Sequence, residues 1–342
     1  MQKRVWFNQG MPLLEEVFEV VKAVGDSSIF IICSHRLLDF PAGRKCDLFV
    51  KEPDNLSDAE YLEYCLRFAE EHHVDLFVPS SRASLLVANR ERFSAIDVKL
   101  MVAGEADVLE MIRSKAECYE ALGVGLVPMP EYRVFSDLAG FEAAYAEMAP
   151  RHDKVCFKPV AGVFAHGFRV VVPDGGAFDR LMDTGPYTAT TSVGLSEARI
   201  IFGERESFEP FMLMEFLEGR ERSVDCIAEK GKLVRSIIRL KDTHSTQLME
   251  ANPHVDELID RIVGKLKLDG VFNVQFKDHN GEPYLLEINS RMSGGLHKAC
   301  MATQFPMPYW ALRLALGTVS ASEIPFPKTG VRLRKRKSYE ME

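Results

Sequence analysis

Four polar side chains in the C-terminal third of the chain combine oxygen ligands with a guanidinium. They are Gln275, Glu287, Asn289 and Arg291. Mg²⁺ prefers hard oxygen ligands, and it usually shares its coordination shell with phosphate oxygens and water. Arginine suits bidentate contacts to phosphate. Together these residue types predict a site for a magnesium ion bound to a nucleotide phosphate.

Two antiparallel strands are expected to position these side chains. Residues 271–276 are rich in β-branched and aromatic residues, Asn280-Gly281 is a strong hairpin signal, and residues 284–288 run back. Because side chains alternate along a strand, the last three of the four should share one face, and the glutamine can join them from the neighbouring strand.

The alternative interpretation of this segment is the solvated outer face of a hairpin. Two observations favour a binding site. The polar residues interrupt an apolar segment, and a Ser-Gly-Gly element follows at 293–295.

The sequence motif Asn-Val-Gln-Phe, followed by Glu-Ile-Asn-Ser-Arg, resembles the metal-binding end of the ATP-grasp superfamily. It is most similar to the carbamoyl-phosphate-synthetase-like branch, also called the carboxylate–amine ligase branch. The usual motif of that branch is Glu-x-Asn-x-Arg. By this resemblance Gln275, Glu287 and Asn289 would hold one or two Mg²⁺ (or Mn²⁺) ions. Arg291 would stabilise the transferred phosphoryl group.

Two lysines resemble phosphate-binding residues of the same family. Lys158 lies in the apolar segment Cys-Phe-Lys-Pro-Val, before a turn with Gly162 and Gly167 that lets backbone amides approach a phosphate. The loop 161–167 has fewer glycines than is usual in the family. Lys115, in Arg-Ser-Lys-Ala, would contact the α-phosphate. The alternatives are a solvated strand face for the first lysine and a helix surface for the second.

The segment Met-Glu-Phe-Leu-Glu-Gly-Arg-Glu resembles the family hinge that receives adenine. Backbone groups near Glu215 and Leu217 would meet the edge of the base, and the apolar Met214 and Phe216 would line its pocket. Glu221 would accept hydrogen bonds from the ribose hydroxyls, as a carboxylate can. The alternative is an edge strand with exposed glutamates.

Three further residues are candidates for binding the acceptor substrate. Arg82 follows a predicted strand, and its guanidinium matches the geometry of a carboxylate. A solvent-facing arginine at a helix N-terminus is the equal alternative. Arg239 and His244 flank Leu-Lys-Asp-Thr, near which the resembled branch has a histidine. A surface position is the alternative for such a loop histidine.

The composition is that of an ordinary globular protein of 342 residues, with 46% hydrophobic and 27% charged residues. A formal net charge of −8 and the lack of a basic domain argue against a nucleic-acid partner. Seven cysteines without a Cys-x-x-Cys pair suggest free thiols in a reducing compartment. No apolar N-terminal segment and no apolar run of about 18 residues occurs. We therefore expect a soluble, cytoplasmic protein with no membrane partner.

The expected fold class is α/β with α+β lobes. Residues 1–104 alternate strand and helix patterns, which implies a parallel sheet, and a capping box at Ser57 opens one helix. No Gly-x-Gly-x-x-Gly fingerprint follows the first strand, so a standard dinucleotide site is not expected. The resemblance implies a Rossmann-like pre-ATP-grasp domain (1–104) and an ATP-grasp domain (105–342), with a lid lobe at about 150–215 and a metal-binding lobe at about 216–342.

Periodicity and turn signals predict the individual elements. Helices are expected over 13–24, 57–71, 83–92, 105–122, 137–149, 253–268, 296–303 and 308–316. Further strands are expected over 5–8, 29–33, 75–79, 99–102, 155–160, 168–172, 211–217, 223–228 and 232–240.

The resemblance implies an ATP-dependent ligase that joins a small carboxylate to an amine, or to a thiol, through an acyl phosphate. Small-molecule carboxylates and amines would then be its partners, ATP and Mg²⁺ its cofactors, and a homodimer is the default expectation for a soluble enzyme. Three alternatives stay open: an ATP-grasp kinase that phosphorylates a small molecule, a nucleotide-binding sensor without turnover, and an α/β binding module with an accidental motif.

Overall fold

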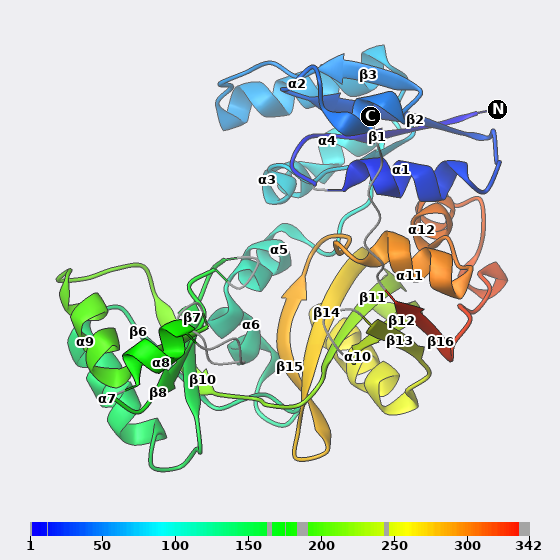
Figure 1. Ribbon diagram of the computed structural model, residues 1–342. Helices are drawn as coiled ribbons and strands as arrows, with labels where there is room; N and C mark the ends of the chain where they lie inside the picture. Colours follow the sequence, from blue (N-terminus) through cyan, green and yellow to red (C-terminus); the bar gives the residue numbers. More distant parts are fainter. Residues whose placement is uncertain are drawn as a thin grey trace. The chain divides into compact units, whose positions relative to one another are not determined.

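The computed structural model describes residues 2–11, 13–162, 166–174, 176–182, 191–242 and 246–334. The chain groups into two compact units, and Figure 1 labels their helices and strands. The first unit comprises Met1–Ile112, Arg220–Phe276 and Glu287–Glu342, and the second comprises Arg113–Gly219 and Lys277–Leu286. Each unit is described by itself.

A parallel sheet of five strands forms the N-terminal part of the first unit, in the order β3-β2-β1-β4-β5. Its strands are β1 (Lys3–Phe7), β2 (Ile29–His35), β3 (Leu48–Lys51), β4 (Leu76–Val78) and β5 (Lys99–Leu100). The accompanying helices are α1 (Leu14–Lys22), the 3₁₀ helix η1 (Pro41–Arg44), α2 (Asp58–Glu71), α3 (Ala83–Ala88) and α4 (Arg90–Ser94). This confirms the predicted parallel sheet of alternating strands and helices.

Local sequence explains one helix start and one helix break in this part. Ser57 caps α2 as predicted, because its side chain accepts the Glu60 amide while the Glu60 carboxylate accepts the Ser57 amide. The helix predicted over 83–92 is instead two helices, α3 and α4. It breaks at Asn89, whose side-chain amide donates to the carbonyl of Leu85 at 2.9 Å.

A six-stranded sheet carries the predicted metal-binding segment, in the order β15-β14-β11-β12-β13-β16. Its strands are β11 (Glu221–Glu229), β12 (Lys232–Lys241), β13 (Thr246–Glu250), β14 (Gly270–His279), β15 (Glu282–Asn289) and β16 (Val331–Arg334). The first unit also contains α10 (Pro253–Leu266), α11 (Leu296–Thr303), α12 (Met307–Leu316), η2 (Ala321–Glu323) and all but the last residue of α5 (Ala106–Arg113). The turn between β14 and β15 has positive φ at Asn280 (51°) and Gly281 (85°), as the predicted hairpin requires.

The second unit is built around a five-stranded sheet in the order β6-β10-β7-β8-β9. Its strands are β6 (Tyr132–Phe135), β7 (Val155–Pro159), β8 (Arg169–Val172), β9 (Ser192–Gly194) and β10 (Phe211–Glu215). Its helices are α6 (Lys115–Leu122), α7 (Leu138–Met148), α8 (Ala177–Met182) and α9 (Leu195–Gly203). Phenylalanine rings fill its core, and Phe135, Phe141, Phe157 and Phe202 are each at most 4% exposed. Strands β7 and β8, which correspond to the strands predicted over 155–160 and 168–172, pair antiparallel.

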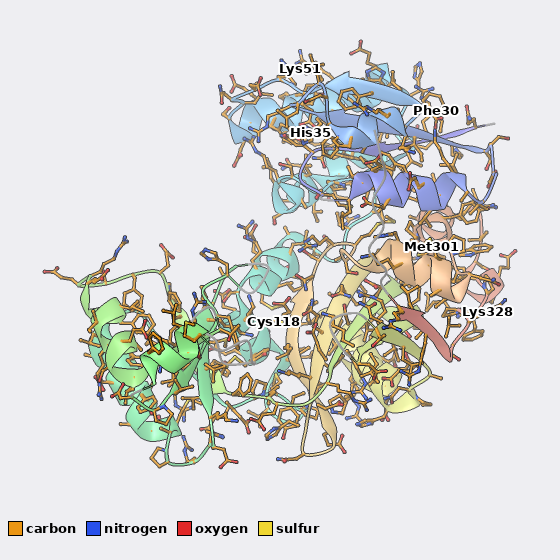
Figure 2. The ribbon with its side chains drawn as sticks, in the orientation of Figure 1. Phe30, His35, Lys51, Cys118, Met301 and Lys328 are labelled. Atoms are coloured by element: carbon orange, nitrogen blue, oxygen red, sulfur yellow. The ribbon has the colours of Figure 1, made fainter. Side chains whose placement is uncertain are left out.

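All seven cysteines are free thiols, which agrees with the prediction. Cys118 of α6 is one of the buried ones (Figure 2). Within the described ranges, no helix is both long and apolar enough to cross a membrane.

Candidate functional site

The predicted metal ligands lie on the neighbouring strands β14 and β15, and all of them are half-buried. On β15, the side-chain amide of Asn289 donates to Glu287 Oε1 at 3.1 Å, so these two side chains lie together. On β14, Nε2 of Gln275 donates a weak bond to Oδ1 of Asn273 at 3.5 Å. Arg291 was predicted to share a strand face with Glu287 and Asn289. Strand β15 ends at Asn289, so Arg291 instead lies after the strand.

The donor set fits a magnesium ion. Each of the two amides uses an N–H group on a neighbouring side chain, which leaves its carbonyl oxygen as the atom to offer a cation. Together with the Glu287 carboxylate they supply three hard-oxygen groups. Among the residues that the structure describes, no group of three or more His, Cys, Asp or Glu is arranged for a metal, so a zinc-type centre has no support there.

Arg239 is 3% exposed, and the protein itself satisfies its guanidinium. Its Nε donates to Asp225 at 3.0 Å, and its Nη2 donates to the hydroxyls of Ser223 at 2.8 Å and Ser293 at 2.7 Å. The predicted role in substrate binding does not fit this geometry. Arg239 instead links β11 and β12 to the segment that follows Arg291.

Asn273 completes a buried polar chain that the sequence analysis missed. The residue is fully buried, and its Nδ2 lies 3.0 Å from Asp225 Oδ1 and 3.1 Å from Ser223 Oγ. Its Oδ1 accepts the bond from Gln275. The chain of contacts therefore runs from Arg239 through Asp225 and Asn273 to a predicted metal ligand. An asparagine inside an apolar strand, two residues from Gln275 and so on its face, was the available signal.

The structure brings Lys115 to the predicted phosphate loop. Lys115 begins α6 and is only 9% exposed. Its Nζ donates to the carbonyl of Gly162 at 3.1 Å, and its amide donates to that of Val160 at 3.2 Å. Lys158 is half-buried on β7, opposite Met212 of β10. A helix-surface role for Lys115 is therefore wrong.

The loop also requires a glycine at its far end. Gly167 has a φ of +72°, and a Cβ atom there would lie 2.9 Å from two ring carbons of Pro159. Positive φ and this close approach exclude larger residues. Residues 163–165 of the same loop lie outside the described ranges.

The backbone amides of the hinge segment differ in whether they are already bonded. The amide of Glu215 donates to the carbonyl of Glu131 at 3.0 Å, and the amide of Phe216 donates to that of Lys154 at 3.1 Å. The amide of Leu217 donates to no residue that the structure describes. This is one of the backbone groups that the resemblance assigns to the edge of adenine.

The remaining predicted nucleotide contacts differ in their surroundings. Met214 is buried, whereas Phe216 is half-buried, with the Lys277 ammonium 4.8 Å from its ring centroid. Glu221 pairs with Lys241 across β11 and β12. The Glu221 carboxylate therefore already has a cation, which a ribose hydroxyl would have to share.

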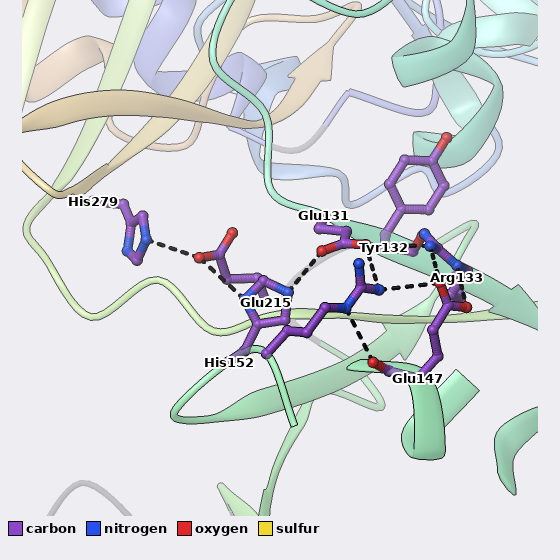
Figure 3. A network of polar contacts seen from close by, with 8 residues as sticks. Glu131, Tyr132, Arg133, Glu147, His152, Glu215 and His279 are labelled. Carbon is purple, nitrogen blue, oxygen red and sulfur yellow. Dashed lines mark hydrogen bonds and ion pairs between the residues drawn. The ribbon is translucent and has the colours of Figure 1, made fainter. Parts of the chain in front are cut away.

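Two histidines hold the side chain of Glu215 (Figure 3). His279 Nε2 lies 2.8 Å from Glu215 Oε1, and His152 Nδ1 lies 3.5 Å from the same oxygen. The other ring nitrogen of His152 lies 2.9 Å from Glu131 Oε2. This hydrogen bond from His152, followed by the charges of Arg151 and Arg133, lowers the pKa of Glu131. Sequence spacing gave no signal for the group, because its members come from four distant segments.

The two other candidates for substrate binding gain no support. The guanidinium of Arg82 donates to the carbonyls of Leu56 and Ser57 at 2.7 and 2.9 Å and lies 3.2 Å from Asp58. This geometry ties Arg82 to the start of α2 and does not fit a free carboxylate-binding group. His244 lies outside the described residues.

Comparison with known proteins places these residues in a family context. Residues 207–339, which include the hinge and the β14–β15 hairpin, match the family model described as ATP-grasp in the biosynthetic pathway with Ter operon. The chain is also similar to the carbamoyl phosphate synthase large chain of Thermoanaerobacter sp. (strain X514), at 28% identity over 123 residues. That match covers 32% of this chain and only 12% of the relative.

Solved structures resemble nearly the whole chain. The ADP complex of N5-carboxyaminoimidazole ribonucleotide synthetase has a TM-score of 0.66 at 13% identity, covering 96% of this chain and 79% of that chain. The L-amino acid ligase from Bacillus licheniformis has a TM-score of 0.64 at 15% identity, covering 95% and 77%. This chain has the ATP-grasp fold. The ATP-grasp similarity extends over the N-terminal parallel sheet as well as the two later sheets.

Proposed function

We propose that the chain is an ATP-dependent ligase that activates a small carboxylate as an acyl phosphate and joins it to an amine. The observation that carries the proposal is the Glu287–Asn289 pair on β15 with Gln275 on the neighbouring β14, a set of oxygen ligands suited to Mg²⁺. The ATP-grasp family match and the ligases among the similar folds support an ATP-dependent ligase.

In this proposal the hinge and two lysines bind the nucleotide. The Leu217 amide would donate to the base, and Lys115 and Lys158 would offset the negative charge of the phosphates. A lysine as buried as Lys115 interacts strongly with a phosphate, because less water screens the pair. Its bond to Gly162 already orients the ammonium toward the loop.

Side chains on and just after the β14–β15 hairpin would hold the metal ion and the phosphoryl group. When bound, Mg²⁺ neutralises charge on the phosphate oxygens. Glu287, Asn289 and Gln275 would hold the ion, and Arg291 would bind the phosphoryl group in transfer. The buried series of hydrogen bonds from Arg239 through Asp225 to Asn273 would orient the Gln275 side chain.

Two displacement steps would follow. A carboxylate oxygen of the first substrate attacks the γ-phosphorus of ATP, and the bond to ADP breaks. The nitrogen of the second substrate then attacks the acyl carbon, phosphate leaves with the bonding electrons, and the nitrogen loses a proton. Both steps need positioning and charge neutralisation more than covalent help from the protein.

The test is ADP and phosphate release from Mg-ATP with a panel of amino acids and other small carboxylates, alone and in pairs with amines. We expect release that requires both a carboxylate and an amine. Release with a single hydroxyl compound would instead identify a kinase. ATP binding without release by any pair would favour a sensor, and absence of ATP binding would reject the proposal.

A further inference from the structure

We propose that His152 and His279 are positioning residues that hold the base-binding hinge through the Glu215 carboxylate, and that His152 does so with a proton on each ring nitrogen. This inference rests on the proposed nucleotide site, because the Leu217 amide that would meet the base lies two residues after Glu215. Neither histidine is expected to touch the nucleotide.

The contacts to Glu215 converge on one oxygen. His279 Nε2 and His152 Nδ1 lie 2.8 and 3.5 Å from Oε1, and the two rings approach from different segments (Figure 3). The side chains are 23% exposed for His279 and 14% exposed for both His152 and Glu215. Because water reaches them poorly, the charges interact more strongly than a surface pair would.

His152 lies between two carboxylates, one at each ring nitrogen. Its Nε2 is 2.9 Å from Glu131 Oε2, while its Nδ1 faces Glu215. An ionised carboxylate only accepts hydrogen bonds, and a neutral imidazole has only one N–H group. A neutral ring would therefore turn a lone pair toward one of the two carboxylates. A ring with two protons satisfies both.

The charges around Glu131 explain why it can hold this contact. Arg151 Nη2 and Arg133 Nη2 lie 2.7 and 3.2 Å from its Oε1, which leaves Oε2 to His152. Both arginines also pair with Glu147 of α7. Arginine keeps its charge at all physiological pH values.

Side chains from other elements also lie near the hinge. Lys154 pairs with Glu218 after β10, Lys277 lies over the Phe216 ring, and Tyr284 of β15 packs its ring edge-on to His279. Loss of the His152 proton would remove one attachment of the hinge, so nucleotide affinity should fall as the pH rises.

The experiment measures binding of Mg-ATP to the full-length chain by calorimetry at pH 6 and pH 8. The variants are His152→Gln and His279→Gln. His73→Asn removes an exposed histidine of the first unit, whose φ of 49° asparagine tolerates, and serves as the matched control. At pH 6 we expect His152→Gln to bind about tenfold more weakly than wild type, the effect of one charge-assisted hydrogen bond. At pH 8 the difference should shrink, and the control should follow wild type at both values.

A second readout does not need the nucleotide. Long-range ¹H–¹⁵N spectra of the wild-type chain should show both nitrogens of His152 protonated at pH 6, which also covers the case that a variant does not fold. Wild-type affinity in both histidine variants, or a neutral His152 at pH 6, would overturn the inference. A wild-type chain that binds no ATP, yet shows a doubly protonated His152, would instead reject the proposed nucleotide site.

Discussion

Arg239 and Asp225 form an ion pair inside the six-stranded sheet, with 3.0 Å between Nε of the arginine and Oδ2 of the aspartate. Their side chains are 4% and 0% exposed. Two charges buried this deeply persist only when their remaining polar atoms are also bonded, and Ser223, Ser293 and Asn273 provide those bonds. The buried pair therefore stabilises the sheet, and through Asn273 it also helps to position the side chain of Gln275, a predicted metal ligand.

Removing the arginine should leave a buried, uncompensated carboxylate. We expect Arg239→Ala to lower the free energy of unfolding by about 3–5 kcal/mol, the usual effect of breaking a buried pair. The measurement is urea denaturation. Arg261→Ala is the matched control, because Arg261 pairs with Glu257 on the exposed face of α10 and should lose less than about 1 kcal/mol. Equal losses in the two variants would contradict a buried link.

The proposed metal site should be sensitive to the loss of the Glu287 carboxylate. We expect Glu287→Ala to remove Mg²⁺-dependent ATP consumption, by on the order of 10²–10³ in rate or more, while the protein stays folded. ADP release and far-ultraviolet circular dichroism measure the two outcomes. Glu229→Ala, at the end of β11 in the same sheet, should keep wild-type turnover. Unchanged turnover in Glu287→Ala would remove this residue from the site.

The buried lysine of the second unit should act on nucleotide affinity. Lys115→Met keeps most of the apolar stem but removes the ammonium that bonds the Gly162 carbonyl. We expect ATP binding at least about tenfold weaker, since a charged contact to phosphate is lost. Lys45→Met, at an exposed surface pair with Glu19, is the control that should bind ATP normally. Calorimetry measures the ATP affinity of both variants. Equal affinities would show that Lys115 only orders the loop.

Much of the fold followed from local sequence patterns. The helix predicted over 296–303 is α11 with the same bounds, and the Asn280-Gly281 turn closes the predicted hairpin. Glu287 and Asn289 could be assigned together because two residues apart on a strand means one shared face. These signals are short-range, so one sequence suffices to show them.

Long-range and weakly periodic features could not be predicted in the same way. The contacts of Arg239 with Asp225 and Ser293, and of His152 with Glu215 and His279, join segments that only the folded chain brings near each other. The helical pattern predicted over 105–122 hides a break, at which Ser114 caps α6. Strands β3 and β6 were not predicted, and neither shows the alternation of buried and exposed residues that marks a half-buried strand.

The predicted phosphate loop allows a stability test that does not depend on nucleotide. Gly167→Ala should lower the free energy of unfolding by about 1–2 kcal/mol from its positive φ alone, and by more because the new Cβ would meet Pro159 at 2.9 Å. Gly264→Ala is the opposite case. Gly264 lies inside α10 with nothing within 4 Å of an added Cβ, so alanine there should stabilise by about 0.5–1 kcal/mol. Thermal unfolding of both variants shows whether each substitution stabilises or destabilises the protein. Stabilisation by Gly167→Ala would contradict the described turn.

Glu52 in the N-terminal sheet should make stability depend on pH. The residue follows β3, is fully buried, and accepts the Gln9 amide at 3.1 Å, the Ser34 hydroxyl at 2.7 Å and the Tyr61 hydroxyl at 3.2 Å. Burial raises its pKa above the ordinary value of 4.5, although these hydrogen bonds partly oppose the shift.

The sign of the effect follows from proton uptake. Between pH 4.5 and the raised folded value, the native state binds this proton and the unfolded state has lost it, so the free energy of unfolding falls as the pH rises through that window. Glu52→Gln has no proton to lose, so its advantage over wild type should grow with pH across the window and then stay constant. Urea denaturation of both proteins in half-unit steps from pH 4 to pH 8 measures this difference. A difference that shrinks with rising pH would mean that the hydrogen bonds outweigh burial and that the folded state prefers the ionised carboxylate.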